Sequence, residues 1–387
     1  MDGTLRCARC DRDHRHQPAA WRCQVCAGPL NWQRAPGPWW RRRDLARRPA
    51  GVWRYREALP CLEPTAGLAD MATPLVPLDV AGVPVLAKCE FCLPTGSYKD
   101  RGAAVLIRWL QAAGVTAALE DSSGNAGAAL AAAATRAGLA LTVFCPASAP
   151  PGKRAQIRAY GARLVAVEGP RARATEALLA HAEATGAAYA SHLWHPLFLH
   201  GVKTMAFELW EQLGGVAPAT VVCPTGAGSI LLGLHLGFAQ LLAAGLIRAL
   251  PRLVAVQAER VQPVCQAWHA GDATVTPATA TEPTLADGIA LPGPVRGMEV
   301  LAALRDSRGM ALAVTEEEIA DGVRQLGRAG LCVEPTSAVV WPALSRLHQA
   351  GRLPTDGGVV AILSGNGLKA VGVLADLIEP EGAPAAP

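Results

Sequence analysis

Charged residues are scarce in this chain, and its start lacks an export signal. Asp, Glu, Lys and Arg make up 18% of the 387 residues, whereas hydrophobic residues make up 51%. This composition buries well and argues against a disordered protein. Residues 1–30 contain four cysteines and several charges where a signal peptide needs an apolar run, so we expect a cytoplasmic protein. The eleven cysteines then indicate thiols and metal ligands, not a disulfide framework.

Long hydrophobic runs are also lacking. The longest apolar stretch, residues 230–247, follows a Gly-rich turn and is interrupted by His235 and Gln240. About 18 apolar residues are the least that cross a bilayer, so the interruptions favour a buried helix, and we expect no membrane partner. The length of the chain predicts two or three domains.

Positive charge is concentrated at the N-terminus. Residues 1–56 hold thirteen Arg and four Asp, a net charge of +9, although the whole chain carries only +4. Basic segments of this kind bind nucleic acid in some proteins. The alternative, which we favour, is an arm that packs Trp39, Trp40 and Trp53 against the main body and leaves its arginines in water. We therefore expect no nucleic-acid partner.

Four cysteines near the N-terminus have the spacing of a metal site. Cys7 and Cys10 form one CxxC pair, and Cys23 and Cys26 form a second pair twelve residues later. Two such pairs offer four thiolates to one tetrahedral ion and leave no open position, so the spacing predicts a structural Zn²⁺. The alternatives are a degenerate ribbon that has lost its metal, or a redox pair.

Strand-like and helix-like stretches alternate from about residue 71. We predict strands at residues 83–92, 115–121, 141–145, 163–167, 220–223, 253–257 and 359–363. We predict helices at residues 100–113, 126–137, 152–160, 171–185, 230–244, 316–329 and 337–350. Strands separated by helices indicate parallel sheets covered on both faces, which bind ligands beyond the carboxyl ends of their strands.

Four polar or Gly-rich loops follow predicted strands. Residues 94–102 place Lys99 at a helix start, where the helix dipole disfavours the ammonium form and favours a nucleophilic amine. Residues 122–127 precede a long helix and offer backbone N–H groups to a carboxylate. Residues 224–229 suit a phosphate but lack the GK[ST] ending of a nucleoside-triphosphate loop. Residues 364–369 follow the last predicted strand. Singly these signals are weak, and together they are specific.

The motifs PTGSYKDRGA, SSGNAG, PTGAGS, EPTSA and LSGNGLK, in that order, resemble those of the fold-type-II pyridoxal-phosphate enzymes. Within that group the chain most resembles threonine synthase and its relatives, from about residue 70 to residue 375. The N-terminal cysteines also resemble a ribbon found on some threonine synthases. The resemblance implies a pyridoxal-phosphate-dependent lyase that acts on an amino acid by elimination or replacement at the β or γ carbon, and it implies a homodimer.

The resemblance also implies a domain organisation. We expect an α/β fold with two doubly wound parallel-sheet domains. The large one, residues 71–113 and 186–380, binds the cofactor, and the small one comprises residues 114–185. A zinc-ribbon-like segment (1–33) and a basic, Trp-rich arm (34–70) precede them.

Individual roles follow from the same resemblance. Lys99 matches the lysine of the family motif SFKDRG, which implies that it binds pyridoxal phosphate covalently and carries the α-proton. Asn125 would hydrogen-bond the ring hydroxyl of the cofactor, and Ser364 would meet its pyridine nitrogen. The cofactor phosphate would lie on the backbone of Gly226, Ala227, Gly228 and Ser229. The substrate carboxylate would lie on Ser122, Ser123 and Gly124.

One segment departs from the family pattern. Typical threonine synthases carry Asn-Pro-x-Arg before Gly-x-Lys-Thr, whereas this chain has HPLF at 195–198 and GVKT at 201–204. An apolar ring such as that of Phe198 cannot replace a guanidinium that pairs with a phosphate. Either other residues, such as Lys153, Arg154 or Lys203, bind the phosphate of O-phosphohomoserine, or the substrate differs. His195 is a candidate substrate contact, and the alternative is a structural histidine before proline.

Three functions therefore stay open. Threonine synthase, which converts O-phosphohomoserine to threonine, is the leading interpretation. A serine or threonine dehydratase, or a β-replacement amino-acid synthase of the same fold, is the alternative. A non-catalytic protein that binds nucleic acid on this scaffold is a remote third.

Overall fold

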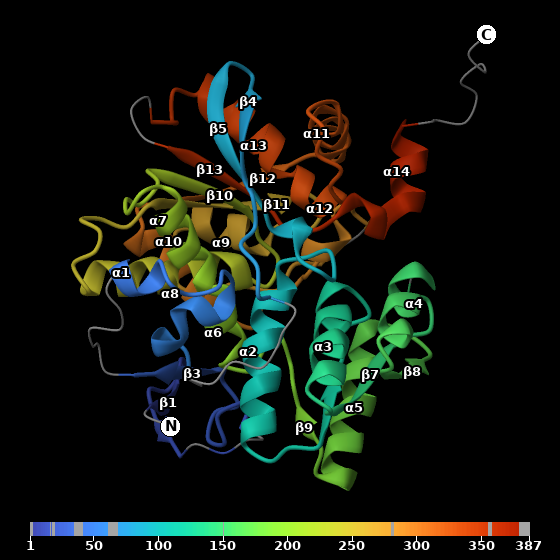
Figure 1. Cartoon of the computed structure of the whole chain (residues 1–387). Helices are drawn as coiled ribbons and strands as arrows, with labels where there is room; N and C mark the ends of the chain where they lie inside the picture. Colours follow the sequence, from blue (N-terminus) through green and yellow to red (C-terminus); the bar gives the residue numbers. More distant parts are fainter. Residues whose placement is uncertain are drawn as a thin grey trace. The chain divides into compact units, whose positions relative to one another are not determined.

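The described part of the chain forms three β-sheets and a set of helices (Figure 1). The computed structural model describes residues 3–15, 17, 20–34, 42–60, 69–149, 151–279, 282–354 and 358–378. The strands are β1 (Thr4–Cys7), β2 (Asp13–His14), β3 (Leu30–Gln33), β4 (Leu75–Val80), β5 (Val83–Cys89), β6 (Ala117–Glu120), β7 (Ala140–Pro146), β8 (Arg163–Val167), β9 (Ala188–Tyr189), β10 (Thr220–Pro224), β11 (Arg252–Ala258), β12 (Met310–Val314) and β13 (Val359–Leu363).

The helices are α1 (Arg42–Leu45), α2 (Lys99–Ala112), α3 (Asn125–Arg136), α4 (Pro151–Ala159), α5 (Arg171–Thr185), α6 (Phe198–Val202), α7 (Thr204–Gln212), α8 (Ser229–Ala243), α9 (Pro263–Ala270), α10 (Gly297–Asp306), α11 (Glu316–Arg328), α12 (Pro335–Ala338), α13 (Val340–Gln349) and α14 (Val371–Ile378). Short 3-10 helices are η1 (Val52–Ala58), η2 (Glu90–Cys92), η3 (Asp287–Ile289) and η4 (Gly367–Ala370).

The chain divides into two compact units. Unit 1 comprises Met1–Ala72, Leu93–Glu211 and Leu236–Arg248, and unit 2 comprises Thr73–Cys92, Gln212–His235 and Ala249–Pro387. These boundaries differ from those of the expected domains. Residues 93–113 and 186–211 were expected in the large domain, but they lie in unit 1 together with the expected small domain, residues 114–185. The physical reason is that α2 packs against both α3 and α6.

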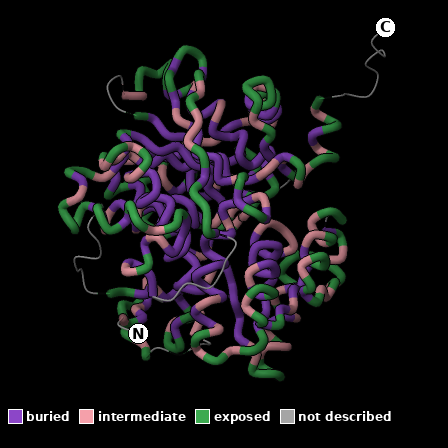
Figure 2. The backbone as a smooth tube through the Cα atoms, viewed as in Figure 1, coloured by how far each residue is buried: buried purple, intermediate pink, exposed green. Residues whose placement is uncertain are grey.

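Unit 2 contains a six-stranded sheet in the order β12-β11-β10-β13-β5-β4. The strands β12, β11, β10, β13 and β5 are parallel to their neighbours. All five residues of β10 and of β13 are buried, and helices lie on both sides of the sheet (Figures 1 and 2). Continuous apolar strands are what a sheet covered on both faces requires, so the predicted doubly wound arrangement is present here.

The expected purely parallel sheet is corrected at one edge. β4 pairs antiparallel with β5, and the two strands are joined by Ala81 and Gly82, whose φ angles are 54° and 84°. Two consecutive positive φ angles are typical of the tight turn that connects neighbouring antiparallel strands. The sheet is therefore mixed.

Unit 1 contains a four-stranded parallel sheet in the order β8-β7-β6-β9. α5 packs on β6, β7 and β8, while α3 packs on β7 and α4 on β8. Unit 1 also contains a three-stranded antiparallel sheet, β2-β1-β3, formed by the cysteine-rich segment. A zinc ribbon was predicted here, and the described residues show the small sheet and its cysteine cluster.

Several predicted elements coincide with the structure. The predicted strands 163–167 and 359–363 and the predicted helix 171–185 match β8, β13 and α5. The predicted helix 337–350 is wrong as a single helix, because α12 ends at Ala338 and α13 begins at Val340. Pro342 has no N–H to donate to the carbonyl of Ala338, so a continuous helix cannot form there.

The N-terminal arm is only partly described. Trp39 and Trp40 lie outside the described residues, whereas Trp53 is buried as expected. Arg48 is not left in water, because its guanidinium pairs with Glu57 at 2.5 Å. Most of the apolar stretch 230–247 lies in α8, which ends at Ala243 and in which Leu231, Leu234 and Phe238 are buried. No helix within the described ranges is long and apolar enough to cross a membrane.

Two glycines allow the close contact between α2 and α6. A Cβ atom at Gly201 would lie 1.9 Å from the carbonyl oxygen of Arg101, and one at Gly102 would lie 2.5 Å from the ring of Phe198. A side chain at Gly201 would require the backbone to move, and one at Gly102 would require the Phe198 ring to move. The packing of α6 on the start of α2 therefore depends on both glycines.

We expect Gly201→Ala to lower the free energy of unfolding by about 2 kcal/mol or more, because the new methyl group meets backbone atoms that cannot move aside. Chemical denaturation of the purified protein measures this. Gly327→Ala is the matched control, since Gly327 lies in α11 with open space around its Cβ position. That variant is expected to be neutral or slightly stabilising. Equal stability of the two variants would contradict the packing argument.

Candidate active site

Lys99 is the first residue of α2, as the sequence predicted. The preceding loop is fixed to this helix by Asp100, whose carboxylate accepts a hydrogen bond from the N–H of Thr95 at 2.9 Å and another from the Thr95 hydroxyl. Thr95 and Asp100 are buried, whereas Lys99 is partly exposed. The amine therefore lies at a fixed helix N-terminus and remains accessible.

Aromatic rings surround the Lys99 amine. Its Nζ lies 2.5 Å from Oη of Tyr98 and 5.8 Å from the centre of the Phe198 ring. The ring of His192 approaches Phe198 edge-on, with 6.0 Å between ring centres and an interplanar angle of 70°. Lys99 and His192 thus adjoin the same apolar ring.

A buried ion pair holds α2 against α7. Nη1 and Nη2 of Arg101 lie 3.1 and 3.0 Å from the two carboxylate oxygens of Glu208, and Nη1 also donates to the hydroxyl of Thr204. The Arg101 side chain is fully buried, and that of Glu208 nearly so. A buried guanidinium needs a paired carboxylate in this bidentate geometry. The pair therefore fixes the helix that begins with Lys99.

The loop of residues 122–124 joins β6 to α3. The N–H of Gly124 donates to the hydroxyl of Ser122 at 3.3 Å, and a Cβ atom at Gly127 would lie 1.9 Å from the carbonyl oxygen of Ser122. The loop is thus pressed onto the first turn of α3, which begins at Asn125. Ser123 and Gly124 are partly exposed. Hydroxyl groups and first-turn N–H groups together suit an anion such as a carboxylate.

A buried cluster at the ends of β6 and β9 was missed by sequence reasoning. Glu120 is the last residue of β6, Asp121 follows it, and His192 comes three residues after β9. Oε1 of Glu120 lies 2.6 Å from Nδ1 of His192, and Asp121 accepts a hydrogen bond from the Thr175 hydroxyl at 2.7 Å. The signal is weak in the sequence, because β9 has only two residues and was not predicted.

The cluster changes the proton affinity of its members. Burial and the neighbouring Asp121 raise the pKa of Glu120 well above its ordinary value. Burial and the cations Lys99 and Arg171 lower the pKa of His192 well below its ordinary value. Both changes favour the uncharged forms, a protonated carboxyl group and a neutral imidazole.

In unit 2, the loop before α8 follows β10 and requires glycine. A Cβ atom at Gly228 would lie 2.2 Å from Cγ2 of Val300, and the φ angle of this residue is 85°. A Cβ atom at Gly226 would lie 2.8 Å from the backbone of Ile289. The loop therefore presents backbone rather than side chains at the N-terminus of α8, which suits a phosphate.

Ser364 follows β13 in unit 2 and contacts a second hydroxyl. Its Oγ lies 3.1 Å from Oγ of Ser337, which also accepts a hydrogen bond from the N–H of Gly365 at 2.8 Å. Both serines are buried. Ser337 comes from the EPTSA motif, and sequence reasoning did not assign it a role.

Comparisons with known proteins agree with these features. The sequence pattern of the family described as "Pyridoxal-phosphate dependent enzyme" matches residues 68–365. The chain belongs to this family. It is 33% identical over 334 residues to a threonine synthase of Methanocaldococcus jannaschii, covering 84% of this chain and 82% of that protein. It is 34% identical over 325 residues to a threonine synthase of Synechocystis, covering 81% and 82%.

Solved structures of the family show the same fold. A crystal structure of a bacterial threonine deaminase has a TM-score of 0.65 and 30% identity, covering 76% of this chain and 92% of that chain. A structure of O-ureido-L-serine synthase also has a TM-score of 0.65, at 23% identity, covering 86% of this chain and 97% of that one. The fold-type-II assignment is therefore confirmed, and the protein is a pyridoxal-phosphate-dependent carbon–oxygen lyase.

Two residues expected to contact the substrate are buried and engaged in other contacts. Lys203 is fully buried, and its Nζ donates to the carbonyl oxygen of Ala58 at 2.6 Å and lies 2.9 Å from Nδ1 of His200. His195 is 2% exposed, and its Nδ1 accepts the N–H of Leu197 at 3.3 Å. This geometry does not support either residue as a substrate ligand. His192 is the histidine at the sheet edge.

The four predicted metal-ligating cysteines lie together. Sγ of Cys7 is 3.4 Å from Sγ of Cys26, and Sγ of Cys10 is 3.7 Å from Sγ of Cys23. All four sulfurs lie within 4.8 Å of one another. Zn–S bonds of about 2.3 Å in a tetrahedron place sulfurs about 3.8 Å apart, so the donor set has the size of a zinc site. Nε2 of His14 lies 3.2 Å from Sγ of Cys23.

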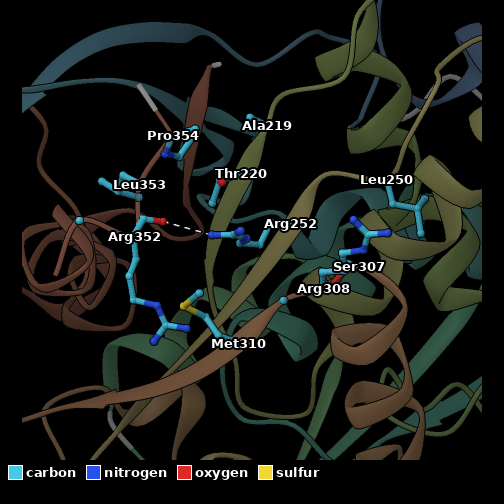
Figure 3. Close-up of a pocket in the computed structure, with 12 residues that line it drawn as sticks. Ala219, Thr220, Leu250, Arg252, Ser307, Arg308, Met310, Arg352, Leu353 and Pro354 are labelled. Carbon is cyan, nitrogen blue, oxygen red and sulfur yellow. Dashed lines mark hydrogen bonds between the residues drawn. The ribbon is translucent and has the colours of Figure 1, made fainter. Parts of the chain in front are cut away.

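A separate cavity of about 620 Å³ lies at the amino ends of β10, β11 and β12 in unit 2 (Figure 3). Its lining includes Arg252, Arg308 and Arg352, and Arg252 donates to the carbonyl oxygen of Arg352 (Figure 3). None of the predicted site residues lines this cavity. The predicted cofactor loops follow the carboxyl ends of the strands, where parallel sheets bind ligands. This cavity lies at the amino ends of strands and is therefore not the predicted cofactor site.

The buried ion pair predicts a specific pattern of stability. We expect Arg101→Met to lower the free energy of unfolding by about 3–5 kcal/mol, because Glu208 then keeps a buried charge without its partner. Adding Glu208→Leu is expected to recover part of this loss. Chemical denaturation measures both effects. Arg173→Met, which breaks an exposed pair with Glu176, is expected to cost less than about 1 kcal/mol. A double variant as unstable as Arg101→Met would contradict the prediction.

Proposed function

We propose that this protein is a threonine synthase that converts O-phosphohomoserine and water to threonine and phosphate. The observation that carries the proposal is the match to threonine synthases along more than four-fifths of both chains. The placement of the site motifs also supports it. Each of them follows the carboxyl end of a strand: Lys99, residues 122–124, residues 226–229 and Ser364.

We assign the cofactor contacts as follows. Lys99 binds the aldehyde of pyridoxal phosphate, Asn125 meets the ring hydroxyl, and Ser364 meets the pyridine nitrogen. The cofactor phosphate lies on the backbone of Gly226, Ala227, Gly228 and Ser229, where no Cβ atom fits at two positions. When bound, the cofactor acts as an electron sink for the bonds broken at the substrate. A serine hydroxyl does not keep the ring nitrogen protonated as a carboxylate would, which favours elimination and replacement.

The substrate contacts follow from the same geometry. We propose that Ser122, Ser123 and Gly124 bind the α-carboxylate, and that Lys99 carries the α-proton once its amine is released. One observation favours a second candidate, a serine or threonine dehydratase. Phe198 stands where typical threonine synthases have arginine, and it is fully buried against Gly102. This ring leaves no cation at that position for a substrate phosphate.

We also propose that Cys7, Cys10, Cys23 and Cys26 bind one structural Zn²⁺. The sulfur distances support this, and so does the packing of the ribbon. Trp21 lies between the two cysteine pairs, and its ring is 5.1 Å from that of Tyr189 and 5.3 Å from that of Trp194. The homodimer, the cytoplasmic location and the absence of nucleic-acid partners stay predictions.

An assay with three substrates tests the proposed function. We expect the holoenzyme to release phosphate and threonine from O-phosphohomoserine, and to act much more slowly on serine and threonine. Lys99→Ala should lose both the activity and the visible absorbance band of the bound cofactor. Arg328→Ala, on the exposed surface of α11, is the control and should keep both. Turnover of serine or threonine without phosphate release from O-phosphohomoserine would establish the dehydratase instead.

Elemental analysis tests the zinc site. We expect about one equivalent of Zn²⁺ in freshly purified protein, and a loss of most of it in Cys10→Ser, because three thiolates bind the ion less tightly than four. Cys332→Ser, which removes an exposed cysteine far along the chain, should keep the metal. Because the ribbon packs on Tyr189 and Trp194, the zinc-depleted protein should also unfold at a lower temperature. Less than half an equivalent of zinc in the unaltered protein would refute the site.

A further inference from the structure

We propose that Glu120 and His192 form a proton-transfer pair for the oxygen atom at the β-carbon of the substrate. This inference rests on the proposed function, in which water adds at that carbon to make threonine. His192 would contact the water, and Glu120 would act through His192 as a positioning and proton-holding residue.

The first support is the position of the pair. β6 and β9 are neighbouring parallel strands, paired at Ala118 with Ala188 and at Leu119 with Tyr189, so Glu120 and His192 lie at the same carboxyl edge. Glu120 immediately precedes the loop 122–124, which we assign to the substrate carboxylate. His192 adjoins the Phe198 ring, which also borders the Lys99 amine. The pair therefore adjoins the proposed carboxylate site along the chain and shares the Phe198 ring with the proposed covalent site.

The second support is the hydrogen bonding of the pair. Nδ1 of His192 is occupied by Oε1 of Glu120 at 2.6 Å, which fixes the imidazole and leaves Nε2 as its other polar atom. His192 retains 7% exposure, whereas Glu120 has none. Oε2 of Glu120 has no hydrogen-bond partner among the described residues. A carboxylate oxygen buried in this way favours the protonated carboxyl group, so the protonated group can donate a proton to the imidazole, and the ionised group can take one from it.

The third support is that the proposed reaction needs a group that accepts a proton from water. Water that adds to a carbon atom must lose a proton as its oxygen forms the bond. Lys99 is assigned to the α-proton. Phe198 is apolar, and the buried Lys203 is held by Ala58 and His200. Among the described residues, His192 is an ionisable group beside Phe198 that the proposed reaction does not yet use.

The proton step balances without a further reactant. The step starts from the form in which Glu120 is ionised and Nδ1 of His192 carries a proton. An O–H bond of the water breaks as its oxygen bonds to the β-carbon, and the released proton passes to Nε2 of His192. The proton on Nδ1 passes to Oε1 of Glu120, so the imidazole ends neutral and the carboxyl group ends protonated. Elimination of a β-hydroxyl group as water is the reverse: Nε2–H donates to the leaving oxygen, and Nδ1 takes the proton from Glu120.

Product partition tests the pair directly. With O-phosphohomoserine, we expect Glu120→Gln and His192→Asn to continue releasing phosphate, and to make about 10²-fold less threonine per phosphate released. Exchange of the substrate α-proton with deuterium, followed by NMR, should persist in both variants. His348→Asn, on the exposed surface of α13, is the control and should match the unaltered enzyme. Unchanged threonine per phosphate in both variants would overturn the inference.

A purely structural role gives a different result. If α-proton exchange and threonine formation fell together in both variants, the pair would only support the fold, and the inference would be wrong. If the unaltered enzyme releases no phosphate, the proposed function fails instead. The pair is then tested with threonine as substrate, where both variants should lose 2-oxobutanoate formation and keep α-proton exchange. Equal loss of both activities would again overturn it.

The pH dependence gives a second readout. The pair accepts a proton from water only after Glu120 has lost its own, so threonine formed per phosphate should rise with pH in the unaltered enzyme and stay flat in His192→Asn. The charged and titratable groups facing the pair are Asp121, Lys99, Arg171 and Tyr189. Asp121→Asn removes the like charge beside Glu120 and should move the rise to lower pH. An identical pH profile in all variants would contradict the pair.

Discussion

The buried ion pair of Arg101 and Glu208 is the constraint on which the arrangement of unit 1 depends. A guanidinium that is fully removed from water is tolerated only with a carboxylate in bidentate contact, and this fixes α2 on α7. The carbonyl oxygen of the same arginine lies so close to Gly201 in α6 that no Cβ atom would fit between them. Lys99, two residues earlier, is therefore held by a charged contact and a tight backbone contact at once. The motif Lys-Asp-Arg-Gly at 99–102 contains the residues behind these contacts. Asp100 fixes the preceding loop, Arg101 forms the ion pair with Glu208, and Gly102 leaves room for the Phe198 ring.

The cysteine-rich segment is part of this same unit rather than an appendage. Trp21 packs on Tyr189 and Trp194, and Trp32 meets the ring of His200 with 4.8 Å between ring centres. These contacts all fall on the segment that runs from β9 to α7, which also carries His192 and Phe198. A metal that holds the ribbon together would thus stiffen the segment next to Lys99. This gives a physical reason for a structural ion far along the sequence from the proposed chemistry.

The sequence predicted what local patterns determine. β8, β13 and α5 were placed correctly because their apolar periodicity and flanking turns are local, and the Gly-rich loops were found because a missing Cβ atom is visible in the sequence. Contacts between distant residues were not predictable. Lys203 was expected to face the substrate, yet it reaches Ala58, 145 residues away. His192 was not considered, because the segment alone does not show that it follows a strand of two residues.

The apolar ring of Phe198 and the raised pKa of Glu120 are related through the charge near Lys99. Replacing an arginine by an apolar ring removes a cation from the neighbourhood of Lys99, and a buried carboxylate left beside that gap would be costly. The uncharged form of the Glu120–His192 pair avoids this cost, because a protonated carboxyl group and a neutral imidazole carry no net charge. Phe198 and the pair are therefore compatible for the same electrostatic reason. A neutral polar pair beside an apolar ring is better suited to handling a hydroxyl group or water than to holding a phosphate dianion. We accordingly expect the phosphate of O-phosphohomoserine to be bound by groups other than those around Phe198.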